Sequence, residues 1–462
     1  MGYSLRRSLP WHLLPSIFVL AWPTMLEQLM QTAVQYVDVA MVGSLGTQAT
    51  AAVGATGTVS WLVGSTISAV GIGFLAYISQ ACGAGEYQRA KQASAQSVLA
   101  VLVLGLLFTA LTLGLSGMVP VWMQVDAEIQ DISSLYFFII YSPMLFRTAI
   151  IIFGTVLRSA GDTKTPMWVG LLMNLLNLIL NFLLIYPTRT IHLGDFSLWM
   201  PGAGLGIVGA AIGTAASFVA GGLIITWKLF AHKFVSPIGH SIKPDRAVLM
   251  PCLKVALPNC LQRFGTSLGY VVFAAMINSL GDVATAAHTI ANTVESAFYI
   301  PGYGMQTAAA TLAGNAWGAR DTKRIRDLTR MILPVEVALM ILSGGLLFIL
   351  APGMMSMFSK DQQVILLGAT VLRMVALSEP FYGVTIIIEG MMQGMGNTVI
   401  PFVCNILGMW VVRIVGTFLC VELLNMGLVS AWACMIGHNL LLFGIFGFLC
   451  VTGRYIPQKQ TA

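Results

Sequence analysis

The chain is a succession of long apolar stretches separated by short polar segments. A helix that crosses a bilayer needs about 20 predominantly apolar residues, and stretches of this length recur along the whole sequence. The alternation of apolar and polar residues that a membrane β-barrel requires is not found, so the pattern predicts helices. The twelve expected spans are approximately 14–40, 51–78, 93–119, 132–157, 166–187, 204–231, 248–277, 286–312, 331–351, 363–391, 398–422 and 427–451.

The composition supports a membrane protein. Of the 462 residues, 57% are hydrophobic and only 9% are charged, whereas an average soluble domain is about 25% charged. A soluble fold of this length could not bury so much apolar surface. The predicted fold class is therefore an all-α polytopic membrane protein with twelve transmembrane helices.

Lys and Arg gather on one side of this topology. Eighteen of the 24 lie in the two tails or in the loops that follow even-numbered spans, and the opposite loops hold two, Arg189 and Lys360. Basic loops stay in the cytoplasm, so both termini are expected there. The net charge of +6 reflects this bias, and no nucleic-acid partner is expected. The seven cysteines lack the paired spacing of a metal cluster, so neither disulfides nor such a cluster is expected.

The sequence contains an internal repeat. A shift of 235 residues places "LAWPTMLEQL…AMVGSLGTQATAA" (20–52) over "VALPNCLQRF…AMINSLGDVATAA" (255–287), and it also places "GDTKTP" (161–166) over "GNTVIP" (396–401). Six spans per half is an even number, so both halves enter the membrane in the same sense and are related by a pseudo-two-fold axis along its normal.

The repeat predicts two six-helix bundles. We expect an N-terminal bundle over 1–231, a polar and basic cytoplasmic linker over 232–247, and a C-terminal bundle over 248–462. Polar groups cannot face lipid without cost, so they should gather where the bundles line a water-filled cavity. Such a design suits transport by alternating access.

Several stretches resemble one family from end to end. They are "WPTMLEQLMQTAVQYVDVAMVGSLGTQATAAVG", "SQACGAGEYQRA", "GTVLRSAGDTKTP", "NLLNLILNFLLIY", "GIVGAAIGTAAS" and "AAHTIANTVESAFYIPGYGMQTAAATLAGNAWGARD". In order and spacing they resemble the multidrug and toxic compound extrusion (MATE) family, and "VESAFYIPGYG" is similar to its DinF-like bacterial branch.

This resemblance implies a function. It implies an antiporter in a bacterial plasma membrane that exports organic, often cationic, compounds and is driven by H⁺ or Na⁺. It implies no enzymatic activity and no cofactor. Small organic cations and membrane lipids are the expected partners, and the chain is expected to be a monomer.

Asp38 is the first candidate for coupling. A carboxylate costs about 2.5–3.5 kcal/mol at the centre of a membrane helix on insertion scales, yet Asp38 lies in the first span. It could be an interfacial or locally paired residue, and its repeat partner is Phe273. The resemblance instead implies that Asp38 is the cation-linked acid of the N-terminal bundle.

The fifth and sixth spans supply companions. Asn174, Asn177 and Asn181 are spaced three and four apart, so they share one helical face. They could simply hold helices together, but the resemblance implies that Asn177 and Asn181 belong to the cation site, where many DinF-like members have aspartate at the second position. It adds Thr214 as a hydroxyl ligand, although a threonine can also bond back to its own helix. A Na⁺ site at Asp38, Asn177, Asn181 and Thr214, or a proton on Asp38, is thus expected.

The C-terminal half carries further intramembrane acids. Glu295 and Glu379 are placed to face the cavity, and the aromatic rings of Tyr299 and Tyr382 could contact a cationic compound. With Gln306 they form the candidate substrate cavity, although such acids can also sit in internal ion pairs.

Other acids of this half have less prominent expected roles. Glu336 and Glu389, near cytoplasmic helix ends, are expected in internal ion pairs. The NorM-like branch has an acid where this chain has Thr266, so coupling is expected in the N-terminal bundle.

One alternative function belongs to the same superfamily. Related exporters flip lipid-linked or amphipathic precursors, but they usually have more spans and a strongly basic central cavity. This sequence places few arginines within its spans. The histidines show no metal-binding or acid–base spacing, so an intramembrane enzyme has no support.

Overall fold

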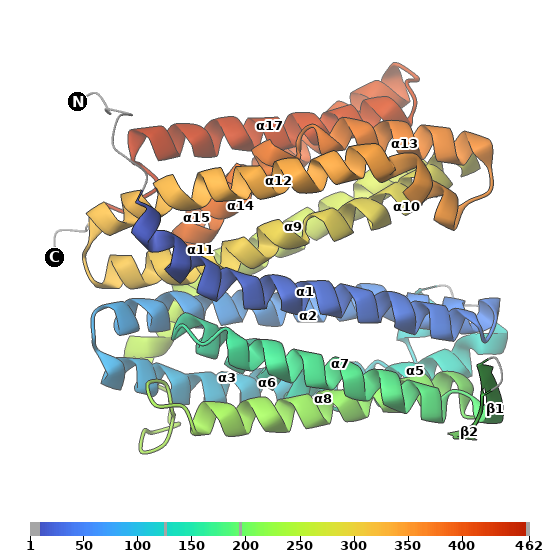
Figure 1. Cartoon of the computed structure of the whole chain (residues 1–462), viewed down its shortest axis with the longest axis horizontal. Coiled ribbons are helices and arrows are strands. Elements are labelled where there is room, and N and C mark those ends of the chain that lie inside the picture. The colour runs from blue at the N-terminus through green and yellow to red at the C-terminus, as the bar shows by residue number, and fades with distance from the viewer. Residues whose placement is uncertain (1–9, 124–126, 194–195, 459–462) are drawn as a thin grey trace. The chain divides into compact units, whose positions relative to one another are not determined.

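A computed structural model describes residues 10–123, 127–193 and 196–458, and Figure 1 shows that long helices make up most of it. The helices are α1 (Leu14–Gly43), α2 (Thr47–Gly83), α3 (Tyr87–Gly114), α4 (Val119–Trp122), α5 (Gln130–Tyr141), α6 (Met144–Ser159), α7 (Lys164–Leu184), α8 (Gly206–Phe230), α9 (Arg246–Asn278), α10 (Asp282–Phe298), α11 (Ile300–Gly318), α12 (Thr322–Phe358), α13 (Gln362–Ala376), α14 (Glu379–Gly394), α15 (Val399–Leu407), α16 (Val415–Phe418) and α17 (Leu428–Thr452). Short 3₁₀ helices are η1 (Trp11–Leu13) and η2 (Ala127–Ile129), and the π-helical segments η3 (Gly408–Ile414) and η4 (Leu419–Leu423) flank α16.

Helix is found at every expected span. Among the described residues, nine helices are long and apolar enough to cross a membrane, or up to eleven when each of two bent helix pairs is counted as one span. The remaining expected span, 286–312, falls on α10 and α11. The chain is an all-α polytopic membrane protein, as the apolar pattern predicts.

Three expected spans are broken, and the apolar pattern alone does not predict these breaks. The chain bends by 46° between α5 and α6 and by 53° between α13 and α14, and Tyr299 separates α10 from α11. A proline stands at each break: Pro143, Pro301 and Pro380. Proline lacks an N–H and disrupts a helix interior, but it is tolerated at a helix start. In each of the three spans, one helix therefore ends just before the proline and the next helix begins beside it.

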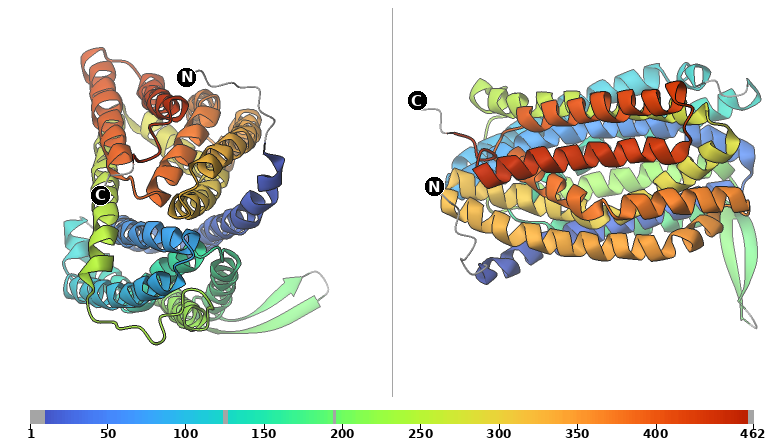
Figure 2. Two further views of the ribbon diagram at one scale, coloured as in Figure 1. Left: turned by 90° about the vertical axis from the view of Figure 1, so that its left-hand side faces the viewer. Right: turned by 90° about the horizontal axis from the view of Figure 1, so that it is seen from above.

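A β-hairpin joins α7 to α8, also unexpected from the sequence. Strands β1 (Pro187–Leu193) and β2 (Phe196–Ala203) pair antiparallel, and Figure 2 shows them projecting sideways from the ends of α7 and α8. The base of the hairpin is closed by two backbone bonds, from Leu205 to Leu184 at 2.9 Å and from Gly206 to Ile185 at 3.0 Å. The hairpin thus holds the end of α7 beside the start of α8.

The chain divides into two compact units. The N-terminal unit comprises Leu26–Phe74 and Tyr87–Met250, and the C-terminal unit comprises Met1–Met25, Leu75–Glu86 and Pro251–Ala462. The sequence repeat suggests a division at 231 and 248 instead, which stays a prediction.

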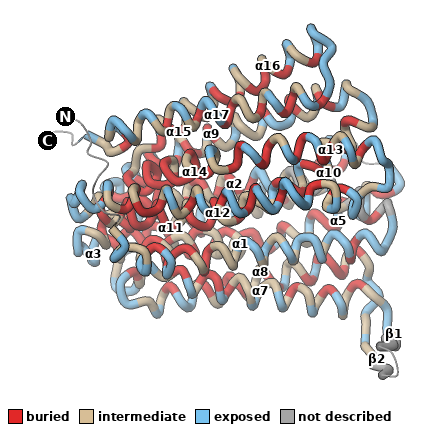
Figure 3. The backbone as a smooth tube through the Cα atoms, turned by 45° about the horizontal axis from the view of Figure 1, so that its top comes forward, coloured by how far each residue is buried: buried red, intermediate tan, exposed pale blue. Residues whose placement is uncertain are grey.

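Close helix contacts explain why two early segments belong to the C-terminal unit. A Cβ on Gly83 would lie 1.9 Å from the carbonyl oxygen of Asn315, so α2 and α11 touch backbone to backbone there. The side chain of Gln80 donates to the carbonyl of Gly394 at 3.1 Å. The hydroxyl of Thr24 donates to the carbonyl of Gly304 at 2.9 Å. In Figure 3 buried positions, drawn red, are frequent along α11 and α14.

Candidate functional site

Helices α7 and α8 approach closely along a row of glycines in α8. A Cβ on Gly209 would lie 2.5 Å from the carbonyl oxygen of Leu184, and one on Gly213 would lie 2.5 Å from the side-chain oxygen of Asn181. Glycines four residues apart lie on one helix face and let two backbones pack closely in a membrane. This row brings the polar residues of the two helices into direct contact.

Four predicted residues meet at this contact in the N-terminal unit. The amide nitrogen of Asn181 donates to Oδ1 of Asp38 at 2.8 Å. When the amide of Asn177 is oriented so that both its ends have partners, its nitrogen lies 2.9 and 3.1 Å from the two Asp38 oxygens, and its oxygen accepts from the Thr214 hydroxyl at 3.0 Å. Asp38 comes from α1, the two asparagines from α7 and Thr214 from α8. These four residues are called the Asp38 site below.

The Asp38 site is enclosed by protein and lacks a basic partner. Asn177 is 5% exposed and Asn181 is 1% exposed, while Asp38 is half-buried. Within the described ranges no basic side chain pairs with Asp38. The side-chain oxygen of Asn181 is buried and has no hydrogen-bond partner in the described chain. The carboxylate is thus held by amide dipoles alone.

The arrangement can bind one positive charge. An ionised carboxylate accepts hydrogen bonds but cannot donate, and the two amide nitrogens meet this requirement. A proton on Asp38 would turn one acceptor oxygen into a donor. A hard cation such as Na⁺ would take the carboxylate oxygens, and rotation of the amides would offer it neutral oxygens as well. Either event requires the site to rearrange.

Two neighbours of the Asp38 site differ from expectation. Asn174 shares its helix face with Asn177 but is half-buried, and its side chain forms no hydrogen bond among the described residues. Only two of the three amides therefore reach Asp38. Tyr136 of α5 is 6% exposed and lies within electrostatic range of Asp38. No sequence pattern distinguishes Tyr136 from other membrane aromatics.

Some of the residues predicted to line the substrate cavity also lie close together, in the C-terminal unit. The hydroxyl of Tyr299 donates to the carboxyl of Glu295, and the rings of Tyr299 and Tyr382 lie 5.0 Å apart. Glu379 interacts electrostatically with Glu295 and Tyr299 and is fully buried, with no hydrogen-bond partner in the described chain. Gln306 instead packs against Gly390, further along α11 and α14.

The expected ion pairs of two other acids are not formed within the described residues. Glu336 is fully buried, both carboxyl oxygens lack hydrogen-bond partners, and its carboxyl packs between Gly302 and Gly383. Glu389 accepts from Gln262 at 2.8 Å and also from two other side-chain amides. The neutral amides of Gln262 in α9, Gln393 in α14 and Asn405 in α15 take the place of the expected basic partner.

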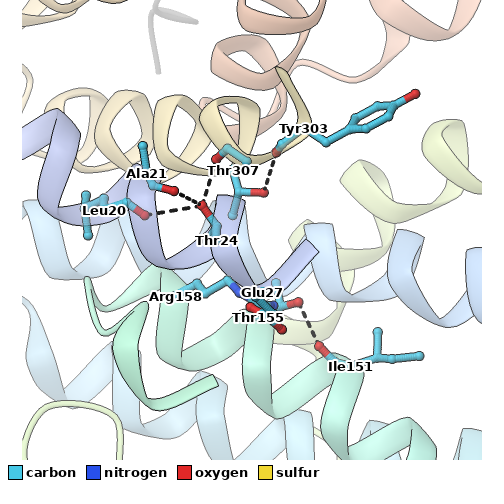
Figure 4. A network of polar contacts seen from close by, with 10 residues as sticks. Leu20, Ala21, Thr24, Glu27, Ile151, Thr155, Arg158, Tyr303 and Thr307 are labelled. Atoms are coloured by element: carbon cyan, nitrogen blue, oxygen red, sulfur yellow. Dashed lines mark hydrogen bonds and ion pairs between the residues drawn. The ribbon is translucent and has the colours of Figure 1, made fainter. Parts of the chain in front are cut away.

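An ion pair that the sequence pattern does not indicate joins α1 and α6. Arg158 places one guanidinium nitrogen 2.5 and 2.7 Å from the two carboxyl oxygens of Glu27, and both residues are labelled in Figure 4. The two side chains are 18% and 21% exposed. Helix spacing cannot reveal this pair, because 131 residues separate its members.

The fold and the Asp38 site define a class. They describe a polytopic membrane transporter with a half-buried carboxylate held between helices. Within the described ranges no group of three or more His, Cys, Asp or Glu side chains could hold a metal ion. The Asp38 site contains only one acid, so this finding does not bear on it.

The chain belongs to the MatE family, whose family model matches residues 23–183 and 258–419. The two matches begin 235 residues apart, which is the shift that relates the two halves of the sequence, so the duplication is confirmed. Members of this family are transporters, and the chain is not an enzyme.

Curated relatives and solved structures agree with this assignment. The chain is 27% identical over 441 residues to a probable multidrug resistance protein NorM of Thermotoga maritima, covering 94% of this chain and 93% of the relative. It is 25% identical to a probable multidrug resistance protein YoeA of Bacillus subtilis, covering 92% of each. The expected DinF-like branch stays a prediction.

Two solved structures share the fold. A crystal structure of MATE in complex with MaL6 has a TM-score of 0.86 at 22% identity, covering 95% of this chain and 96% of that one. A MOP superfamily transporter from Pyrococcus furiosus has a TM-score of 0.86 at 23% identity, covering 95% of both chains. The predicted fold class of twelve helices in two bundles is that of MATE transporters.

Proposed function

We propose that the protein is a cation-coupled antiporter that exports organic, often cationic, compounds from the cytoplasm by alternating access. The single observation that carries this proposal is the half-buried carboxylate of Asp38, which two amide nitrogens hold and no basic side chain of the described chain neutralises. The names of the relatives, which are called multidrug resistance proteins, support the choice of substrate class.

The coupling ion is H⁺ or Na⁺, and Asp38 is its binding group. Neutralising the carboxylate removes the charge that the nitrogens of Asn177 and Asn181 solvate, so those hydrogen bonds weaken. The contact between α1 and the α7–α8 pair then changes. A ligand shifts a conformational equilibrium only through such a difference between states. Loading from outside would favour the state that releases the exported compound.

The candidate substrate-binding residues of this proposal belong to the C-terminal unit. Tyr299 and Tyr382 offer aromatic faces to a cationic compound, and Glu295 and Glu379 offer charge complementarity when ionised. The distribution of Lys and Arg supports a multi-pass arrangement in the bacterial plasma membrane with both termini in the cytoplasm. The protein acts as a monomer in this proposal.

The test is ethidium efflux from proteoliposomes with an imposed Na⁺ gradient and, separately, an imposed proton gradient. We expect at least one gradient to drive uphill efflux by the unaltered protein. Asp38→Asn should abolish it, whereas Asp131→Asn should retain it, because Asp131 is exposed in the first turn of α5. Circular dichroism and gel filtration verify folding. Full gradient-driven efflux by folded Asp38→Asn would refute the proposal.

The same vesicles test the alternative function. Flipping of a lipid-linked precursor would appear as gradient-dependent translocation of a fluorescent lipid-linked probe in the absence of ethidium efflux.

A further inference from the structure

Arg413 occupies an unusual position within the C-terminal unit. It lies in the π-helical segment η3 and is 3% exposed. Its Nε and Nη1 atoms are buried without a hydrogen-bond acceptor, and no carboxylate of the described chain forms an ion pair with it. The rings of Tyr270 and Phe273 lie 5.1 and 5.5 Å from the guanidinium. Two aromatic faces offset only part of the cost of removing a guanidinium from water.

Nitrogen-bearing side chains lie around the two rings and the guanidinium of Arg413. His288 has its ring 5.6 Å from that of Phe273, and the Trp432 ring is 5.8 Å from that of His288. Arg413 also acts electrostatically on His288 and on His438. Nδ1 of His288, both ring nitrogens of His438 and Nε1 of Trp432 are all buried without a hydrogen-bond partner in the described residues.

The local backbone is shaped to admit one of these rings. A Cβ on Gly408, the first residue of η3, would lie 2.4 Å from Cδ2 and 2.6 Å from Nε2 of His438. Any other residue would displace the imidazole. π-Helical turns in membrane and soluble proteins often occur at functional sites. Because Gly408 has no side chain, the His438 ring can pack directly against the π-helical segment that carries Arg413.

Glu295 is the candidate to neutralise Arg413 from within the protein. It acts on the guanidinium electrostatically, but it forms no ion pair with it among the described contacts and accepts a hydrogen bond from Tyr299. Water could satisfy some donors, but it would leave the charge uncompensated. A buried charge is normally paired.

We infer that Arg413, with His438, His288 and Trp432, forms a binding site for a small monovalent anion, of which chloride is the inorganic candidate. Arg413 supplies the charge and two free donors, and neutral imidazoles and the indole supply further N–H groups. The site lies outside the Asp38 site and does not depend on the proposed coupling function. Its ligand is an inorganic anion or the carboxylate of an organic compound, and both have the same chemistry at the guanidinium.

Thermal unfolding of the purified protein tests this site. Chloride should raise the unfolding midpoint relative to gluconate at equal ionic strength, by an amount that increases with concentration, because a ligand that binds only the folded state stabilises it. Gluconate serves as the reference because its carboxylate carries a long polyhydroxy chain that is too bulky for a site around a guanidinium that is 3% exposed. Arg413→Gln should weaken the apparent chloride affinity at least tenfold. Arg373→Gln is the matched control, since Arg373 also lies over a ring, that of Phe348 at 5.5 Å, but is exposed; it should keep the full response.

A second measurement covers the case in which Arg413→Gln does not fold. Crystals of the unaltered protein soaked in bromide should show an anomalous peak within hydrogen-bond distance of the Arg413 guanidinium. Acetate in place of chloride identifies the source of the ligand: stabilisation by acetate alone assigns the site to carboxylate compounds. Equal midpoints in chloride, acetate and gluconate, or a bromide map without a peak at Arg413, would overturn the inference.

Discussion

Gly213→Ala tests how the Asp38 site is assembled. The new Cβ would lie 2.5 Å from Oδ1 of Asn181 and 3.4 Å from Cβ of Leu180, so the structure must respond. If α7 moves away, overpacking costs about 1–3 kcal/mol. If the Asn181 amide rotates instead, Asp38 loses its donor at 2.8 Å, a bond to a charged group that is worth about 1.5–3 kcal/mol.

The alanine also has a favourable effect. Replacing a helical glycine by alanine raises helix propensity by up to about 1 kcal/mol. The net expectation is a free energy of unfolding lowered by about 0.5–2 kcal/mol, together with impaired gradient-driven efflux. Gly114→Ala in α3 is the matched control, because nothing lies within 4 Å of its Cβ position. It should be neutral or more stable by up to about 1 kcal/mol.

Denaturant unfolding in detergent and ethidium efflux from proteoliposomes measure the two effects on the same preparations. Equal stability and equal efflux for Gly213→Ala and Gly114→Ala would mean that the close approach of α7 and α8 does not hold Asn181 in place, and the reasoning would fail.

Three further outcomes are expected. Ser343→Ala should lower the free energy of unfolding by about 1–3 kcal/mol, measured by denaturant titration, because the Ser343 hydroxyl donates to the carbonyl of Phe298 at 2.7 Å, beside the break between α10 and α11. Arg158→Met should cost about 1–3 kcal/mol by leaving the partly buried Glu27 unpaired, and a double-mutant cycle with Glu27→Gln should recover a coupling energy. Burial lowers the pKa of His232 below its ordinary 6.5. The neutral form of this histidine therefore contributes stability that is present above pH 6.5 and is lost as the pH falls through the lower pKa of the folded state. His232→Gln should flatten the free energy of unfolding over this pH range, as measured by unfolding at a series of pH values.

Much of the fold could be predicted because the bilayer imposes it. Backbone groups in lipid must be paired within the segment, so every long apolar stretch becomes a helix. The breaks at Pro143, Pro301 and Pro380 were in principle visible as prolines. Pro23, however, lies inside α1 without ending it, so a proline alone does not show which helices break. The hairpin over 187–203 was hidden because a pair of short strands carries a weak periodic signal.

The site was partly predictable for the same reason. Asp38, Asn177 and Asn181 stand out because polar groups are rare and costly in lipid. Their contact distances depend on Gly213, which in the sequence is one of 47 glycines. The neighbours of Tyr136 and Arg413 could not be predicted from the sequence, because tertiary packing alone determines which side chains surround them. Helical spacing likewise placed Asn174 with its companions although it does not reach Asp38.

The closure of the α7–α8 pair limits how the transporter can work. Backbone hydrogen bonds at the base of the hairpin and close glycine contacts along α8 hold these two helices together. Asn177, Asn181 and Thr214 should therefore move together as one rigid body. Asp38 lies on a different helix, α1. Discharge of the carboxylate should therefore be visible as sliding or rotation of α1 against an unchanged α7–α8 pair, and spin labels on α1 would report it while a pair spanning α7 and α8 stayed constant.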